Sequence, residues 1–159
     1  RFVADLAAVA KDVEPGVLVT YASFPPTEYL ELPCLDFVTF NVYLHDREAF
    51  RRYMFRLQNL AGDRPLVLGE LGMDTLRHGE DEQAHFLAGH LEECRLMGLA
   101  GAFVFSWTDD WFTGGYQIRD WAFGVTDADR RPKASYHALG EAHAAPLASR
   151  LPRCPRVSV

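Results

Sequence analysis

The chain has 159 residues, 48% of them hydrophobic and 13% aromatic, which is enough for one globular domain with a buried core. Its formal net charge of −6 and its two lysines argue against a nucleic-acid-binding protein, because phosphate binding depends on clustered positive charge. No apolar run approaches the ~20 residues that span a bilayer, so the sequence predicts no membrane segment.

The first half of the chain predicts two helices and two strands. Apolar residues at helical spacing place a helix at residues 2–13. The β-branched run at residues 17–21 is typical of a strand, and a second strand is predicted at residues 35–43, after a loop that contains prolines. Residues 46–60 have a helical pattern that starts with a capping aspartate and is followed by Gly62.

The second half continues the alternation. An apolar run at residues 65–70 predicts the third strand, residues 80–97 predict a long helix, and residues 101–107 predict the fourth strand. A long loop, residues 108–131, then leads to a last helix that begins at Pro132. The side chains of the long helix that we expect to face the core are Ala84, Leu87, Leu91 and Cys94.

Strands that alternate with helices predict an α/β fold with a parallel sheet covered by helices. Four such strands make either half of an eight-stranded (β/α) barrel or a small doubly wound sheet. No G-x-G-x-x-G follows a strand, so the dinucleotide-binding fold has no support and we expect no cofactor. We prefer the half barrel because polar and aromatic residues follow the strand ends, where such barrels build their active sites. These residues are Tyr21, Ser23, Asn41, Tyr43, Glu70, Trp107, Asp109 and Asp110.

Glu70 is the strongest candidate for a catalytic residue. It stands at the end of the third predicted strand, where an unpaired carboxylate costs a few kcal/mol, roughly 2–5, unless it is paired or used in chemistry. The alternatives are an ion pair with a neighbouring arginine, or a side chain that reaches solvent beyond the strand end.

Four segments resemble the retaining glycosidases with (β/α) barrels, and most of all the branch that contains β-galactosidase and β-glucuronidase. In that branch one strand ends in Asn-x-Tyr, the next presents Glu before Gly, and the last carries Trp. A stretch G-[IVL]-x-[DN]-x-x-R-x-P-K then leads to the final helix. The matching positions here are Asn41 and Tyr43, Glu70 and Gly72, Trp107, and residues 124–133, so the resemblance covers about residues 17–139.

The resemblance implies a role for each matching residue. Glu70 would be the nucleophile that forms a covalent glycosyl-enzyme, and Tyr43 would orient it by a hydrogen bond. Trp107 would form the aromatic floor under the sugar ring. The remaining residues expected to bind substrate are Asn41, Asp109, Asp110 and Trp111.

The acid/base residue of the retaining mechanism is missing. The family takes it from an Asn-Glu pair at the end of an earlier strand, and no Asn-Glu pair occurs in this sequence. We therefore expect the chain alone to have little or no glycosidase activity, with substitution by Asp109 or Asp110 as a minor alternative. Glu82 and His85 have a metal-binding spacing, but an exposed helix face is the favoured interpretation and we expect no metal.

The end of the chain predicts a second part of a larger protein. Residues 1–145 form the half barrel in this interpretation, and residues 146–159 a linker and the start of a following domain. The final PRVSV resembles the first strand of family 2 glycosyltransferases. Because the chain also begins with arginine, we interpret it as a fragment of a larger carbohydrate-active protein.

The cysteines favour a cytoplasmic protein. Cys34, Cys94 and Cys154 are odd in number and lack C-x-x-C spacing, which favours free thiols over disulfides or zinc ligands. The expected ligand is a carbohydrate, and self-association through the open edges of a half barrel is also expected. Two other functions stay open: a non-catalytic carbohydrate-binding or regulatory module, and an unrelated small α/β domain.

Overall fold

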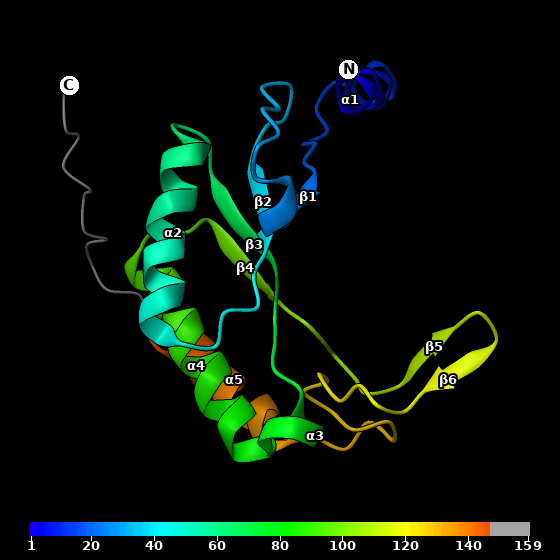
Figure 1. Cartoon of the computed structure of the whole chain (residues 1–159), viewed down its shortest axis with the longest axis vertical. Coiled ribbons are helices and arrows are strands. Elements are labelled where there is room, and N and C mark those ends of the chain that lie inside the picture. Colours follow the sequence, from blue (N-terminus) through cyan, green and yellow to red (C-terminus); the bar gives the residue numbers. More distant parts are fainter. Residues whose placement is uncertain (147–159) are drawn as a thin grey trace. The chain divides into compact units, whose positions relative to one another are not determined.

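The computed structural model describes residues 1–146, and its elements alternate along the chain (Figure 1). They are α1 (Phe2–Val13), β1 (Ala22–Ser23), the 3-10 helix η1 (Pro25–Thr27), β2 (Val38–Asn41), α2 (Arg47–Ala61), β3 (Leu66–Leu71), α3 (Thr75–His78), α4 (Glu80–Leu96), β4 (Gly101–Val104), β5 (Trp111–Thr113), β6 (Tyr116–Ile118) and α5 (Ala134–Ala144). Residues 147–159, which hold most of the predicted linker and the glycosyltransferase-like segment, lie outside the described part.

The chain divides into two compact units. The first unit consists of Arg1–Leu71 together with Ala100–Phe103. The second consists of Gly72–Leu99 and, within the described residues, 104–146. Each unit is described by itself.

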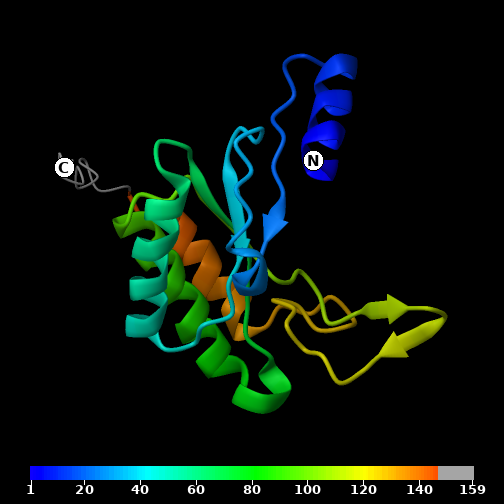
Figure 2. The same ribbon diagram turned by 45° about the horizontal axis from the view of Figure 1, so that its top comes forward.

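The first unit contains a four-stranded parallel sheet in the order β1-β2-β3-β4, as the sequence predicted. Helix α2 lies alongside β3 in both views (Figures 1 and 2) and contacts it. The side chains that fill this contact are fully or almost fully buried: Phe50, Met54, Leu57, Leu66 and Leu68. Asp46 accepts a 2.7 Å hydrogen bond from the Ala49 N–H at the start of α2, and Gly62 ends the helix with φ of 62°.

The first strand is displaced from its predicted place. The sequence predicted residues 17–21, whereas β1 consists of Ala22–Ser23. The reason is that the Val19 backbone is bound by one aspartate: its N–H donates to the Asp36 carboxylate at 2.7 Å, and its carbonyl accepts from the Asp36 N–H at 3.0 Å. The Asp36 carboxylate thus takes the Val19 N–H that a strand ladder would use, while the Val19 carbonyl keeps a backbone hydrogen bond. The predicted strands at 35–43 and 101–107 are also shorter, as β2 and β4.

The second unit is built on the helix pair α4 and α5, which lie side by side (Figure 2). Leu87 and Cys94 are buried on α4 as predicted, and burial raises the pKa of the Cys94 thiol to about 12. Unexpectedly, Gln83 is fully buried too. Its amide nitrogen donates to the Met73 carbonyl at 2.9 Å, and its oxygen accepts from the Ser135 hydroxyl at 2.6 Å.

The predicted loop at residues 108–131 contains a hairpin that the sequence analysis missed. Strands β5 and β6 pair in antiparallel register and extend as an arm (Figure 2). Gly114 and Gly115 form the turn, with φ of 53° and 87°. A two-residue hairpin turn favours glycine at these positions because both need a positive φ. The last helix begins at Ala134, two residues after the predicted Pro132.

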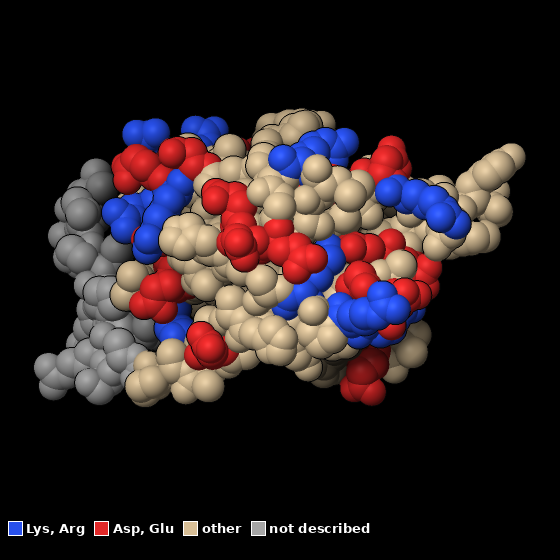
Figure 3. Space-filling view, turned by 90° about the horizontal axis from the view of Figure 1, so that it is seen from below, with Lys and Arg blue, Asp and Glu red and all other residues tan. Residues whose placement is uncertain are grey.

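The surface of the described residues carries mixed charge. Acidic and basic side chains are interspersed over the face shown in Figure 3. Glu82 and His85 are exposed on α4, as expected, and the described residues hold no group of side chains suited to a metal ion. None of the helices in residues 1–146 has the length and apolar character that a membrane crossing requires.

Candidate active site

The end of β3 places Glu70 beside Tyr43. The Tyr43 hydroxyl donates a hydrogen bond of 2.6 Å to Glu70 Oε2. Strands β2 and β3 bring the two residues together, because Asn41 is the register partner of Glu70 and an irregularity follows Phe40 at this point. The Val42 N–H also donates to the Glu70 carbonyl at 2.9 Å, which fixes the backbone on which the carboxylate stands.

The hydrogen bond has a consequence for the tyrosine. Burial of the ring raises the pKa of Tyr43, and the hydrogen bond and the charge of Glu70 raise it further. Tyr43 therefore remains a protonated donor at any physiological pH. A short bond of this kind, between a neutral donor and a carboxylate, is charge-assisted and stronger than a bond between neutral groups.

Glu70 and Tyr43 open into a cavity of about 370 Å³. Asn41 lines the same cavity, so three of the seven predicted site residues meet here. The remaining lining residues are apolar, and the sequence analysis did not single them out as site residues: Phe24, Pro25, Val42 and Leu44. Phe24 directly follows β1, but the predicted strand ended at residue 21, so the sequence contained no signal for Phe24.

Asn41 is held close to β3 by the absence of a side chain at position 69. A Cβ atom on Gly69 would lie 2.6 Å from Asn41 Oδ1 and 2.7 Å from Thr39 Cγ2. Asn41 Oδ1 is buried and has no hydrogen-bond partner within the described part of the chain. A buried acceptor without a donor costs about 1–3 kcal/mol, so this amide is available to a donor that enters the site.

The other four predicted residues belong to the second unit, and Asp109 has a structural role there. Its Oδ2 lies 2.6 Å from Lys133 Nζ, and its Oδ1 accepts from the Gly124 N–H at 2.7 Å. Lys133 also donates to Thr75 Oγ1 at 2.9 Å, and only 5% of its side chain is exposed. Both Asp109 oxygens are therefore engaged in holding the loop that follows β4 against the start of α5.

Asp110 and Trp107 lie at the surface of the second unit. Asp110 forms an exposed ion pair with Arg130 at 3.0 Å. The Trp107 ring is 60% exposed and meets Tyr136 of α5 edge-on, with 5.9 Å between ring centroids. Both side chains have surfaces that a ligand can reach.

Trp111 is part of an aromatic cluster that the sequence analysis did not foresee. Its ring stacks on Phe105 with centroids 5.0 Å apart, and Trp121 meets it edge-on at 6.4 Å. Phe123 contacts both Phe105 and Trp121. The Trp111 Nε1 donor is buried without a partner among the described residues. The density of aromatic residues between positions 105 and 123 was the available signal.

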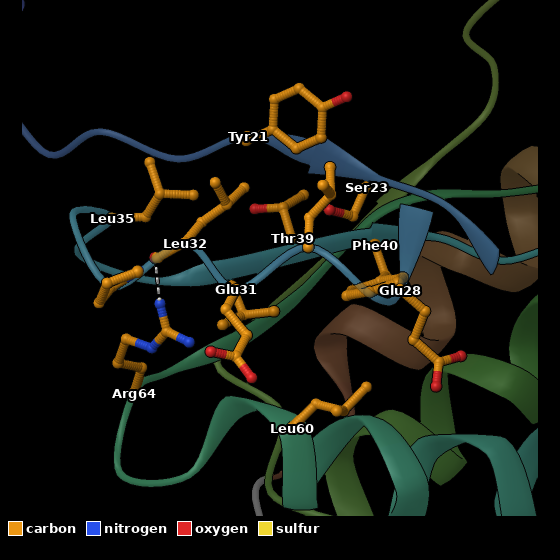
Figure 4. Close-up of a pocket in the computed structure, with 13 residues that line it drawn as sticks. Tyr21, Ser23, Glu28, Glu31, Leu32, Leu35, Thr39, Phe40, Leu60 and Arg64 are labelled. Atoms are coloured by element: carbon orange, nitrogen blue, oxygen red, sulfur yellow. Dashed lines mark hydrogen bonds between the residues drawn. The ribbon is translucent and has the colours of Figure 1, made fainter. Parts of the chain in front are cut away.

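A second cavity of about 380 Å³ lies in the first unit, between β1, β2 and the end of α2 (Figure 4). Two of its charged groups are engaged. Arg64 donates to the Leu32 carbonyl at 2.8 Å, and Glu28 accepts from the Tyr53 hydroxyl at 3.0 Å and pairs with Arg56. Tyr21 and Ser23, two of the polar and aromatic residues expected at strand ends, line this cavity, whereas none of the seven residues predicted as catalytic or substrate-binding does.

No protein-family model and no curated protein matches the chain. Solved structures do match. The crystal structure of Ruminococcus gnavus β-glucuronidase superposes with a TM-score of 0.71 at 20% identity, over 89% of this chain and 28% of that chain. The same enzyme in complex with D-glucuronic acid gives 0.70 at 22% identity, over 87% and 28%. An FMN-binding β-glucuronidase from Facaelibacterium prausnitzii L2-6 gives 0.77 at 16% identity, over 91% and 26%.

The chain thus spans 28% of the length of the Ruminococcus gnavus enzyme that it matches. Because these identities are below 25%, the similarity to these structures is evidence for the fold alone. The parallel sheet β1-β2-β3-β4 and the similarity to glycosidase barrels confirm the predicted fold class: the chain has the α/β fold of part of a glycosidase (β/α) barrel.

Proposed function

We propose that this chain is the nucleophile-bearing part of a retaining glycoside hydrolase, with Glu70 as the nucleophile. The observation that carries the proposal is the 2.6 Å hydrogen bond from Tyr43 to Glu70 Oε2, at the end of a parallel strand and in the wall of a cavity. The likeness to β-glucuronidases supports a glycosidase-type fold.

In this proposal the two carboxylate oxygens have different tasks. Tyr43 holds Oε2, and Oε1 attacks the anomeric carbon. A bond forms between that carbon and Oε1, the bond to the leaving oxygen breaks, and the leaving oxygen takes the electron pair. The acid/base residue of the retaining mechanism gives the leaving oxygen a proton and later takes one from the water that attacks the glycosyl-enzyme, which releases Glu70 as a carboxylate. Tyr43 holds Oε2, and thereby the orientation of Oε1, before the attack and after the release.

The second carboxylate of the mechanism must come from outside this chain. Retaining enzymes place it about 5–5.5 Å from the nucleophile. The sequence lacks the Asn-Glu pair that the resemblance requires, and the chain spans about a quarter of its structural neighbours. We therefore propose that the acid/base belongs to another segment of a longer protein, and that this protein continues into a family 2 glycosyltransferase domain.

The proposed sugar-binding residues differ in how far their polar groups are already engaged within the protein. Asn41 lines the Glu70 cavity and offers an unpaired acceptor. Of the two aspartates, Asp110 is the better candidate for a sugar hydroxyl, because the Asp109 oxygens are bound by Lys133 and Gly124. The Trp107 and Trp111 rings are the proposed stacking surfaces.

Covalent trapping tests the nucleophile without the missing acid. A 2-deoxy-2-fluoro-β-D-glycosyl fluoride needs no proton on its leaving group, so the chain should form a stable adduct that mass spectrometry locates on the Glu70 peptide. Glucosyl, galactosyl and glucuronyl fluorides are the probes. Glu70→Gln should abolish the adduct, and the control Glu82→Gln, on the exposed face of α4, should keep it. An adduct on another residue, or none with any probe, would contradict the assignment.

A non-catalytic carbohydrate-binding module is the second candidate, and the aromatic cluster around Trp111 favours it. In that case the chain would bind sugars without forming an adduct, and Glu70→Gln would leave the affinity unchanged. Isothermal titration with the parent methyl glycosides separates the two functions.

A further inference from the structure

The cavity between β1, β2 and the end of α2 contains charged groups that the proposed function does not use. It shares no lining residue with the Glu70 cavity. Its volume of about 380 Å³ lies within the range of roughly 300–1,000 Å³ that is usual for small-molecule sites. All of its lining residues belong to the first unit, so the cavity does not depend on the second one.

The segment of residues 28–35 lines one side of this cavity and is fastened at two points. At the start of the segment, the Glu28 carboxylate accepts a hydrogen bond of 3.0 Å from the Tyr53 hydroxyl of α2. Four residues later, the Leu32 carbonyl accepts from Arg64 Nη1 at 2.8 Å (Figure 4). The cavity between these two anchors is therefore a fixed part of the fold.

Two opposite charges in the cavity are left for a ligand. Glu28 is not one of them, because Arg56 neutralises it. The Glu31 carboxylate has no hydrogen-bond or ion-pair partner among residues 1–146. Arg64 uses Nη1 and Nε for two backbone carbonyls, which leaves Nη2 without a partner in the described part of the chain. In Figure 4 the Glu31 side chain points towards α2 and the Arg64 guanidinium points towards Leu32, so both charges face the space between the segment and the helix.

The remaining wall on this side is mostly apolar. Leu35 and Phe40 are buried, whereas Leu30 is 37% and Leu60 44% exposed. A ligand with a hydrocarbon body would remove the exposed part of Leu30 and Leu60 from water, which is favourable. The cavity therefore fits a small molecule that carries a positive charge, a negative charge and an apolar group.

We propose that this cavity binds a free amino acid with an apolar side chain. Glu31 binds the α-ammonium group, Arg64 binds the α-carboxylate through Nη2, and Leu30 and Leu60 contact the side chain. An amine or a carboxylic acid would use only one of the two charges, so a zwitterion fits better than either. The proposal depends neither on Glu70 nor on glycosidase activity.

Titration of L-leucine into the 15N-labelled chain, followed by NMR, tests the proposal. 3-Methylbutan-1-amine is leucine without the carboxylate, and 4-methylpentanoate is leucine without the ammonium group. Each should bind at least about 10-fold more weakly than leucine, because each lacks one hydrogen bond between charged groups. Glycine, which lacks the apolar side chain, should also bind at least about 10-fold more weakly.

Two variants locate the charges of the ligand. Glu31→Gln should weaken leucine binding at least about 10-fold and leave 4-methylpentanoate unchanged, because that probe has no ammonium group. Arg64→Met also removes the bond to Leu32, so its readout is the ratio of the leucine affinity to the amine affinity, which should fall at least about 10-fold. The matched control is Glu48→Gln, an exposed change on α2 outside the cavity, which should alter no affinity. Thermal unfolding by circular dichroism checks that each variant is folded.

Three results would overturn the inference. They are absence of leucine binding to the wild type at millimolar concentrations, equal affinity of leucine and either truncated analogue, and equal affinity of Glu31→Gln and wild type for leucine. None of them bears on covalent trapping at Glu70, because the two cavities have no residue in common. The two proposals therefore fail separately.

Discussion

Glu70 owes its position to the strand pairing around it. The register of β2 and β3 sets Asn41 opposite Glu70, and two residues further along the chain Tyr43 reaches back to the carboxylate. The first unit has another tyrosine–glutamate pair, Tyr53 with Glu28, in which the pKa of Tyr53 is raised to about 12. The two pairs have the same chemistry, but only Tyr43 and Glu70 line the cavity at the end of β3. The Tyr53–Glu28 pair can therefore serve as a control for the Tyr43–Glu70 pair.

Tyr43→Phe should slow covalent trapping without preventing it. The substitution removes the hydrogen bond that fixes the orientation of the Glu70 carboxylate, so Oε1 is less often aligned for attack and the rate of adduct formation should fall, by up to about 100-fold. Stopped-time mass spectrometry with the glycosyl fluoride measures this rate. Tyr53→Phe is the control and should leave it unchanged. A Tyr43→Phe variant that reacts at the wild-type rate would show that the hydrogen bond does not assist the attack.

At the scale of the elements, the sequence predicted the helices and strands that rest on local signals. The capping aspartate and Gly62 define α2 at both ends, and the short apolar run defines β3. Prediction failed where a side chain distant in sequence decides the structure. Asp36 takes the backbone of Val19 out of the predicted strand, and Ser135 makes the burial of Gln83 possible on α4. Neither pairing has a signature within a sequence window.

The Glu70–Tyr43 pair was predictable from the resemblance of two motifs, but the rest of the site was not. The cavity includes Phe24 only because β1 pairs with β2, which is a tertiary fact. For the same reason the sequence could not distinguish Asp109 from Asp110. Their difference comes from Lys133, which lies 24 positions later on another element.

Within the first unit, the Asp36 carboxylate should connect Lys11 of α1 to Val19, and this connection should depend on pH. Its carboxylate binds Lys11 Nζ at 2.6 Å and the Val19 N–H, and these bonds lower its pKa from the usual 3.8. A lowered pKa means that the contribution to stability is present above pH 3.8 and is lost as the pH falls through the folded-state value. Hydrogen exchange at the Val19 amide should therefore accelerate in Asp36→Ala at neutral pH. Asp12→Ala, an exposed change on α1, should have no effect, and equal exchange in both variants would contradict the prediction.

The Lys133–Asp109 pair should stabilise the second unit more than any exposed ion pair in it. Lys133 is 5% and Asp109 16% exposed, so removal of one partner leaves a buried charge without compensation. We expect Lys133→Met to lower the free energy of unfolding by about 3–5 kcal/mol, as measured in urea. Asp110→Asn breaks the exposed pair with Arg130 and should cost less than about 1 kcal/mol. Similar losses in the two variants would refute a structural role for the buried pair.

At the scale of the molecule, the main feature is that the four-stranded sheet of the first unit is open at both edges. Strands β1 and β4 are its edges, and parallel sheets of this kind are normally buried on both faces. The β-glucuronidases that the chain resembles are about three to four times longer, since the matched part is 28% or 26% of their chains. The described residues thus form part of a barrel. The edge strands of their sheet have backbone N–H and C=O groups that can pair with another strand.

The isolated chain should self-associate through these edges. Phe103 on the edge strand β4 is 67% exposed, and an exposed apolar edge is a template for pairing with another chain. Light scattering with size-exclusion chromatography should show a mass that rises with protein concentration.

Phe103→Lys should shift the chain towards the monomer, because a lysine on an edge strand opposes pairing. Phe112→Lys is the matched control: Phe112 is 69% exposed on β5, which belongs to a separate two-stranded sheet, so its replacement should leave the association unchanged. A wild-type chain that stays monomeric at every concentration and unfolds in one cooperative transition would show that the edges do not pair.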